Sequence, residues 1–303
     1  MKHFALILTL FVSSSLTAQN LNFNQSHLTG LYSNPGLTGF NQEQKISLNF
    51  RNESPSLSGN VLSTFVSYQN GFNRFGSFGA YYLNDYFKPG AFSSNRMGFN
   101  YAKPFHVARN LVISAGANVS IVNDHLNLAK LTFGDLYHPR SGMNIDFTDL
   151  KKNYWSADLS AGAYFLWGRT FGGFSFNQFA TTGDFKMNNF YANLGTNFRT
   201  KRDDGFSISP EVSINTIDGF ISTAFKVSTF YKWAKLGVEY TNRSQFAVVA
   251  GARIKSFDVS LSTEWTVSEL TTANGISFEL GLSYSIFRRC CKCYRLKFNY
   301  SVF

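Results

Sequence analysis

The reactive side chains that stand out in the sequence are three cysteines, in Cys290-Cys291-Lys292-Cys293 near the end of the chain. Three thiols are one short of the four ligands of a structural zinc site. In an oxidising compartment Cys290 and Cys293 could form a local disulfide, or one cysteine could bond to a partner chain. The alternative is an incidental cluster in a terminal tail, so the spacing alone does not decide their role.

The histidines and glycines form no motif of a catalytic or ligand-binding site. His125 and His138 lie thirteen residues apart, with Asp135 between them, and the sequence contains no metal-binding histidine spacing. No histidine belongs to a recognisable nucleophile motif, which an outer-membrane hydrolase would need. The Phe-Gly-Gly-Phe stretch at 171–174 lacks the following helix of a phosphate-binding loop. We therefore expect no enzyme activity, no cofactor and no metal.

The first residues of the chain predict export. Met1-Lys2-His3 gives a positive start, residues 4–16 are apolar but too few to span a bilayer, and residues 16–18 end in a small residue, Ala18. We interpret residues 1–18 as a signal peptide that is cleaved after Ala18, and we exclude them from the fold. No cysteine follows this position directly, so we expect no N-terminal lipoprotein anchor.

The composition of the remaining chain favours a membrane barrel. It has no apolar run of membrane-helix length. The sequence contains 33 Phe, 15 Tyr and 4 Trp but only 15% charged residues, against about a quarter in soluble domains. An exported chain of this kind suits a closed β-barrel, which satisfies its own backbone in lipid. A secreted β-sandwich is the competing class, but at this length it would need two domains and a visible linker.

The net charge of +10 does not indicate nucleic-acid binding, because the cell envelope offers no such partner. Basic residues are scattered through the turns, with one cluster in the tail, at Arg288, Arg289, Lys292, Arg295 and Lys297. This cluster could contact anionic membrane lipid or an acidic periplasmic protein.

Hydrophobic and small polar side chains alternate along most of the chain. In the clearest case, residues 276–286, an apolar set alternates with a polar one: Ile276, Phe278, Leu280, Leu282, Tyr284 and Ile286 against Ser277, Glu279, Gly281, Ser283 and Ser285. In a barrel wall the first set faces lipid and the second lines the interior. Such runs last ~10–13 residues here, longer than the ~5–6 of a usual strand. Trp167, Tyr231 and Trp233 lie at run ends, as an interfacial aromatic girdle requires.

The runs predict an all-β fold, a transmembrane antiparallel β-barrel of about fourteen strands. A bacterial barrel with both termini in the periplasm has an even number of strands. The count is even here if residues 123–153 form one long outer excursion that contains the weaker run at 126–133. The expected strands are 44–53, 60–70, 75–85, 92–103, 109–122, 154–167, 170–180, 189–200, 205–216, 220–232, 234–242, 245–255, 257–266 and 275–287.

These strands divide the mature chain into three parts. Residues 44–287 form the barrel, residues 19–43 are expected to be a periplasmic N-terminal segment, and residues 288–303 a basic tail. The N-terminal segment carries the turn signal Asn34-Pro35-Gly36. Asp135 and Arg140 in the outer excursion could pair with each other or meet a ligand, since loops on a rigid wall often carry function.

Several landmarks follow one another in a fixed order along the mature chain. They are Asn34-Pro35-Gly36-Leu37-Thr38-Gly39, Arg51-Asn52 with Pro55, Gly76, Gly79, Leu83-Asn84-Asp85, the stretch 131–142, Gly173 with Ser175, Ser209-Pro210, and Glu279 with Leu282-Ser283-Tyr284. In this order they resemble the PorP/SprF family of type IX secretion membrane proteins. Gly36 and Thr38 replace alanines that the family favours, and the cysteine-rich tail is a further departure.

The resemblance implies an outer-membrane component of the type IX secretion machinery, with no enzyme activity and no cofactor. It implies as partners secreted cargo, such as adhesins with C-terminal targeting domains, and periplasmic ring and translocon subunits. Our candidates for partner or cargo contact, or for structuring loops, are Asn34, Pro35, Arg51, Asn52, Asn84, Asp85, Asp135, Pro139 and Arg140. The rival interpretation is a general porin or a channel for hydrophobic solutes, since a lumen lined by Ser, Asn and Gly could hold water. The sequence leaves open whether a loop or the N-terminal segment plugs this lumen.

Overall fold

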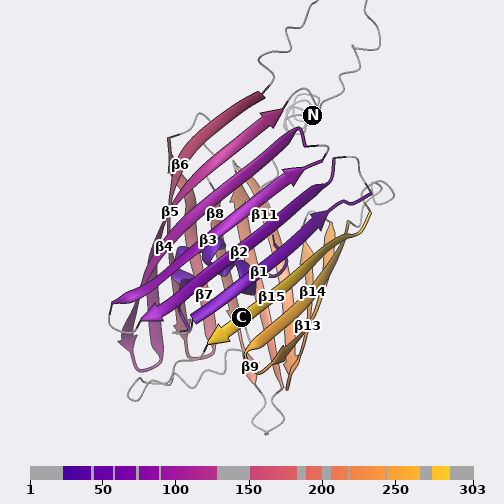
Figure 1. Cartoon of the computed structure of the whole chain (residues 1–303). Helices are drawn as coiled ribbons and strands as arrows, with labels where there is room; N and C mark the ends of the chain where they lie inside the picture. Colours follow the sequence, from indigo (N-terminus) through magenta and orange to yellow (C-terminus); the bar gives the residue numbers. More distant parts are fainter. Residues whose placement is uncertain are drawn as a thin grey trace, which may run out of the picture.

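Antiparallel strands close into a barrel in the computed structural model (Figure 1). The structure describes residues 23–41, 44–56, 59–72, 75–88, 90–127, 151–182, 189–199, 206–217, 219–242, 244–266 and 275–286. Fourteen strands form the wall, and a two-residue strand, β9, lies beside the start of β10. The predicted transmembrane barrel of fourteen strands is confirmed.

Each wall strand corresponds to one of the predicted runs. The strands are β1 (Gln44–Glu53), β2 (Val61–Phe72), β3 (Gly76–Phe87), β4 (Phe92–Ala108), β5 (Leu111–Asn127), β6 (Lys151–Trp167), β7 (Thr170–Thr181), β8 (Asn189–Thr196), β9 (Phe198–Arg199), β10 (Ser207–Ile217), β11 (Phe220–Tyr231), β12 (Ala234–Thr241), β13 (Gln245–Ile254), β14 (Phe257–Thr266) and β15 (Ser277–Ile286).

The first and last strands pair with each other and thereby close the wall. Their register runs from Gln44 opposite Ile286 to Asn52 opposite Phe278. Every other wall strand pairs with the wall strand next in the chain, and β8 pairs with β10. A closed ring leaves no strand edge in lipid, which is the condition for a sheet to span a bilayer.

The two faces of the wall differ as the alternation predicted. In β15 the side chains of Leu280 and Leu282 are 42% and 38% exposed on the outer face, whereas Glu279 is fully buried on the inner face. The same holds across the wall, where exposed apolar residues alternate with buried Ser, Asn and charged residues. The outer face is thus a surface for lipid and the inner face is polar.

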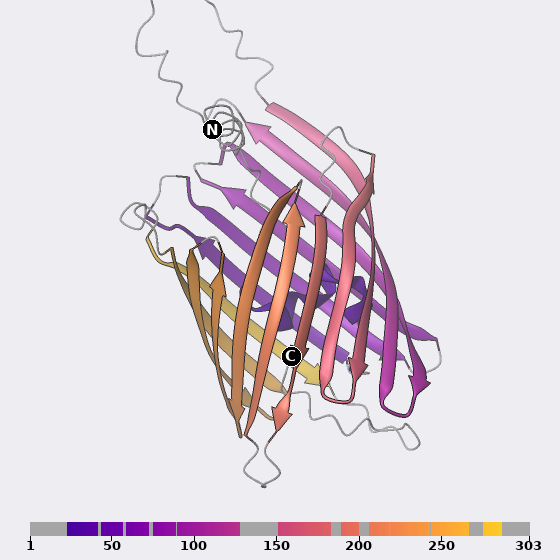
Figure 2. The same ribbon diagram turned by 180° about the vertical axis from the view of Figure 1, so that it is seen from behind.

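Three neighbouring strands are longer than the sequence indicated. β4, β5 and β6 each have 17 residues, so residues 123–127 and 151–153 of the expected outer excursion are paired strand. Among the described residues, the first seven of β6 have β5 as their one strand neighbour, because β7 pairs with β6 only from Asp158 onward. The outer end of β6 therefore continues beyond β7, whereas β4 runs beside β5 as far as Leu126 (Figures 1 and 2).

Most of the shortest turns lie at one end of the barrel. The turns at 109–110, 168–169, 232–233 and 255–256 have two residues each, and β1 begins and β15 ends at this same end. In bacterial barrels the short turns and both chain ends face the periplasm. We use this rule to name the two ends of the barrel periplasmic and outer.

Residues 23–41 lie inside the barrel, where Figure 2 shows them as an indigo segment across the lumen. They contain helix α2 (Ser26–Ser33) and the 3₁₀ helix η1 (Pro35–Leu37). We expected a periplasmic segment, and the sequence left open whether it plugs the lumen; the structure places residues 23–41 within the wall. The reason is that its polar side chains, such as Asn24, Gln25 and Asn34, find hydrogen-bond partners on the inner face. No helix in the described part of the chain is long and apolar enough to cross a bilayer.

We expect a charged residue on the lipid-facing side of the wall to destabilise the barrel more, the closer it lies to the middle of the bilayer. Leu261→Arg, in the middle of β14, should destabilise the inserted barrel by about 2–4 kcal/mol, because an arginine at the midplane faces hydrocarbon. Phe257→Arg, at the periplasmic start of the same strand, should cost about 0–1 kcal/mol. Urea titration of folding into lipid vesicles measures both, and equal costs would contradict the assigned outer face.

Candidate functional site

The candidate site is the luminal segment 23–41, here called the plug, with the wall residues that hold it. Its first anchor is the carboxylate of Glu279. The backbone N–H groups of Asn24 and Gln25 donate to the two oxygens of Glu279, at 3.0 and 3.2 Å. The Gln25 side chain also donates to the Glu279 carbonyl, at 3.1 Å. The last strand of the wall therefore binds the beginning of the plug directly.

Charges buried around Glu279 complete this anchor. Arg51 lies opposite Glu279 in the β1–β15 register, and its Nη1 is 3.4 Å from Glu279 Oε2. Arg51 Nη2 is 2.9 Å from Glu264 Oε2, which also accepts from the Asn24 side chain at 2.8 Å. Asn49 donates to Glu279 at 2.6 Å. Buried charges are costly unless they are paired and hydrogen-bonded, and here both carboxylates depend on Arg51 and the plug.

A lysine of β11 binds the backbone carbonyl of Asn24. The Nζ of Lys226, on β11, donates to the Asn24 carbonyl at 3.0 Å and to Ser26 Oγ at 3.1 Å. Lys226 also lies 3.7 Å from Glu239 of β12. Together with Glu279 it fixes both the N–H and the C=O of Asn24.

The second anchor lies across the lumen, where Asn34-Pro35-Gly36 rests on glycines of β5, β6 and β7. The Asn34 amide donates to the carbonyls of Ala163 and Phe174, at 3.0 and 3.3 Å. A Cβ at Gly116 would meet the Pro35 carbonyl, and a Cβ at Gly162 would meet the Asn34 side chain. The plug can approach this closely only because the wall lacks side chains here.

Side chains of the wall bind mainly the backbone carbonyl groups of the plug. Lys45 donates to the His27 carbonyl at 2.9 Å, and Asn100 donates to that of Leu31 at 2.6 Å. The Ser33 carbonyl accepts from Ser175 and Asn177, at 2.6 and 2.9 Å. Further contacts hold Gly39, whose N–H donates to Gln69 and whose carbonyl accepts from Ser77.

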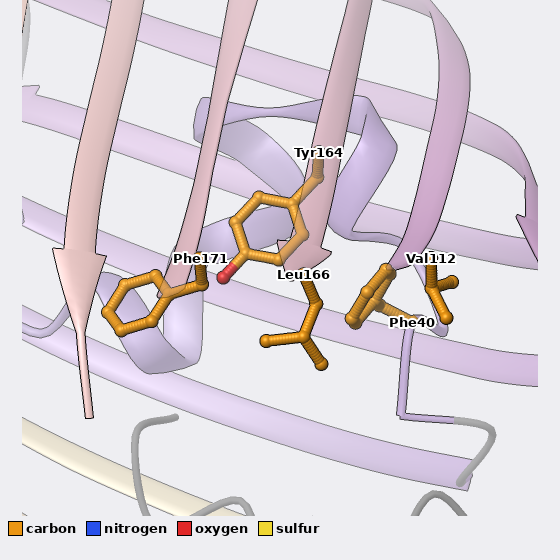
Figure 3. Close-up of a cluster of buried hydrophobic side chains, with 5 residues drawn as sticks. All are labelled: Phe40, Val112, Tyr164, Leu166 and Phe171. Carbon is orange, nitrogen blue, oxygen red and sulfur yellow. The ribbon is translucent and has the colours of Figure 1, made fainter. Parts of the chain in front are cut away.

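Two apolar clusters stabilise the plug beside these polar contacts. One contains Leu31 of α2 with Phe65, Tyr81 and Leu83 of the wall, and Phe23 and Tyr32 pack against it. The other joins Phe40 to Val112, Tyr164, Leu166 and Phe171 (Figure 3), with Leu37 packed against it. The rings of Phe40 and Tyr164 meet edge to face, with centroids 5.0 Å apart. Apolar burial thus holds both ends of the plug within the polar lumen.

A polar cavity remains beside the plug. It lies between α2 and the inner face of the wall, and its lining includes Arg96, Asn177, Tyr191, Glu211, Lys226 and Glu239. Arg96 is paired with Asp158 of β6 at 2.8 Å. The described residues contain no group of three or more His, Cys, Asp or Glu side chains that could hold a metal ion.

The predicted site residues do not form one cluster in the structure. Asn34, Pro35 and Arg51 belong to the two anchors of the plug. Asn52 accepts from Asn60 at 3.2 Å, and Asn84 donates to Asn95 at 2.8 Å, both near the outer end. Asp85 follows Asn84 on β3. Asp135, Pro139, Arg140, Cys290 and Cys293 lie outside the described residues.

Sequence reasoning missed Asn24, Gln25, Asn49 and Glu264 as parts of the first anchor. One signal was available, because Glu264 and Glu279 each fall on an inward position of a strand, where serine otherwise predominates. A carboxylate at such a position requires a buried partner.

Comparison with known proteins agrees with this architecture. A family model described as type IX secretion system membrane protein PorP/SprF matches residues 15–284. No curated protein matches the chain.

Solved outer-membrane barrels share the fold. The Ralstonia pickettii toluene transporter TbuX is 12% identical, with a TM-score of 0.55 over 85% of this chain and 93% of that chain. A Pseudomonas aeruginosa FadL homologue is 12% identical, with a TM-score of 0.50 over 85% and 93%. The Pseudomonas putida toluene transporter TodX is 10% identical, with a TM-score of 0.50 over 89% and 95%. At these identities the likeness shows the fold alone.

We expect Gly162→Ala to loosen the plug. The added methyl group would collide with the Asn34 side chain, at a cost of about 1–3 kcal/mol. Amide hydrogens of the plug around Asn34 should then exchange about tenfold faster or more. Gly237→Ala is the matched control, since its Cβ would come no closer than 3.4 Å to Ser228 Oγ. Equal exchange in the two variants would show that the glycines do not seat the plug.

Proposed function

Because the chain belongs to the PorP/SprF family of type IX secretion system membrane proteins, we propose that its outer side receives secreted cargo while the plug occupies the lumen. The protein is a component of this secretion system in the outer membrane. The proposed cargo is of the adhesin type, with C-terminal targeting domains. The observation that carries the proposal is the plug itself, because a lumen crossed by α2 and η1 leaves the outer rim as the surface for a large partner.

The outer end of the β5–β6 hairpin supports the outer side as the place of cargo contact. The first residues of β6 continue beyond β7 and include Trp155, which is 70% accessible. An exposed aromatic side chain where a strand continues beyond one neighbour is compatible with an interaction surface. The segment 128–150, with Asp135, Pro139 and Arg140, connects β5 and β6, and we propose that it contributes to the same contact.

We further propose that the periplasmic end contacts the ring and translocon subunits of the system, and that the protein has no catalytic role. Residues 288–303, with their basic side chains, follow β15 in the sequence, and β15 ends at the periplasmic end. A pairing of Cys290 with Cys293, or with a cysteine of a partner, would fix the tail in an oxidising compartment. In this proposal no cofactor takes part.

The plug should keep the purified protein from conducting as a porin. We expect little steady current through the full protein in planar bilayers, since plug atoms occupy the lumen, and a several-fold higher conductance after deletion of residues 23–41. If the deletion variant fails to insert, Gly162→Ala can be used in its place and should give intermediate, flickering currents. Steady porin-like currents through the unmodified protein, without any partner, would support the rival channel function.

Deleting residues 128–142 should abolish surface display of cargo and leave the barrel inserted, because the deletion spares β5 and β6. Quantitative proteomics of the cell surface measures proteins with C-terminal targeting domains, and heat-modifiable migration on gels reports the folded barrel. The matched control is deletion of residues 268–272 between β14 and β15, which should leave display unchanged. Normal display in the 128–142 deletion strain would rule out this contact.

A further inference from the structure

Basic side chains mark the periplasmic rim of the barrel. The four two-residue turns described at this end each contain one: Arg109, Arg169, Lys232 and Lys255. All four side chains are exposed. Among the acidic residues of the described ranges, one lies within three positions of these turns, and this residue, Asp258, is buried and bonded to Arg253 at 2.7 Å. The exposed charge of these turns is therefore positive.

The two lysines among these four residues have backbone conformations that favour glycine or asparagine. Lys232 and Lys255 have φ angles of 53° and 56°, in the left-handed region. In the β6–β7 turn, Gly168 takes this conformation, with φ of 62°, and Arg169 follows it. Glycine or asparagine adopts the left-handed region at a lower cost than lysine. The turn geometry thus does not account for the choice of lysine at these two positions.

The rim charges lie next to exposed aromatic side chains. Trp167 precedes the β6–β7 turn, Trp233 shares a turn with Lys232, and Phe257 follows the turn of Lys255. Lys232 Nζ is 5.2 Å from the centre of the Tyr231 ring. Aromatic residues of this kind sit at the boundary between hydrocarbon and headgroups. The basic groups next to them therefore lie at the level of the lipid phosphates.

We propose that this rim binds the headgroups of anionic phospholipids in the periplasmic leaflet. The four turns belong to the hairpins β4–β5, β6–β7, β11–β12 and β13–β14, which are distributed around the barrel rather than gathered on one side. Separate charges around the circumference suit many small anionic headgroups, whereas one acidic protein would be better matched by a contiguous patch. This proposal does not depend on the proposed function in secretion.

Tryptophan quenching by brominated lipid tests the proposal. The full protein, with Trp155 and Trp265 replaced by Phe, keeps Trp167 and Trp233 as reporters at the rim. In mixed vesicles, brominated phosphatidylglycerol should compete for the rim about fivefold better than brominated phosphatidylcholine at low salt. The preference should fall toward unity at about 0.5 M salt, where exposed charges are screened.

The matched variants carry equal changes in charge at the two ends. Lys232→Asn with Lys255→Asn removes two of the four rim charges while asparagine tolerates the left-handed turns, and this variant should lose about half of the preference. Lys88→Asn with Lys152→Asn removes two exposed charges at the outer end and should retain it. Heat-modifiable gel migration verifies that both are folded.

Two results would overturn the proposal. One is equal quenching by the two lipids in the unmodified protein, and the other is an undiminished preference in the rim variant. A protein with no lipid preference whose rim variant nevertheless fails to secrete cargo in cells would show that the rim serves a periplasmic protein instead.

Discussion

The buried carboxylate of Glu279 lies where the barrel closes and where the plug begins. It belongs to β15, faces Arg51 of β1 across the closing pair of strands, and accepts the N–H groups of Asn24 and Gln25. A carboxylate with no exposed surface is tolerated only with such partners. Closure of the wall and seating of the plug are therefore coupled, because the same side chain takes part in both.

The inner face of the wall is suited to binding polypeptide. Lysine, asparagine and serine side chains from several strands contact carbonyl groups of the plug, and glycines of β5 and β6 let its backbone approach. A pore for small solutes needs open space along its axis, whereas this lumen is crossed by a helix whose main chain is fixed at both ends. The shared fold with toluene transporters therefore says little about what passes through this barrel.

The two ends of the barrel have different physical characters. At the outer end β6 continues past β7, and its Trp155 is exposed. At the periplasmic end the tight turns combine basic and aromatic side chains at the level of the headgroups. The two ends therefore differ in strand pairing and in exposed charge, and the proposals for cargo and for lipid rest on these different features.

The sequence by itself determined the barrel, its strands and the family, because period-two alternation and segment length are local properties that each strand shows independently. It also indicated Asn34, Pro35 and Arg51 as notable residues. Only the tertiary structure decided what they do. Arg51, Glu264, Glu279 and Asn24 are far apart in the chain and meet because the wall closes, and the plug shows no alternation that would place it inside. Contacts made by ring closure depend on register and curvature, which no short stretch of sequence encodes.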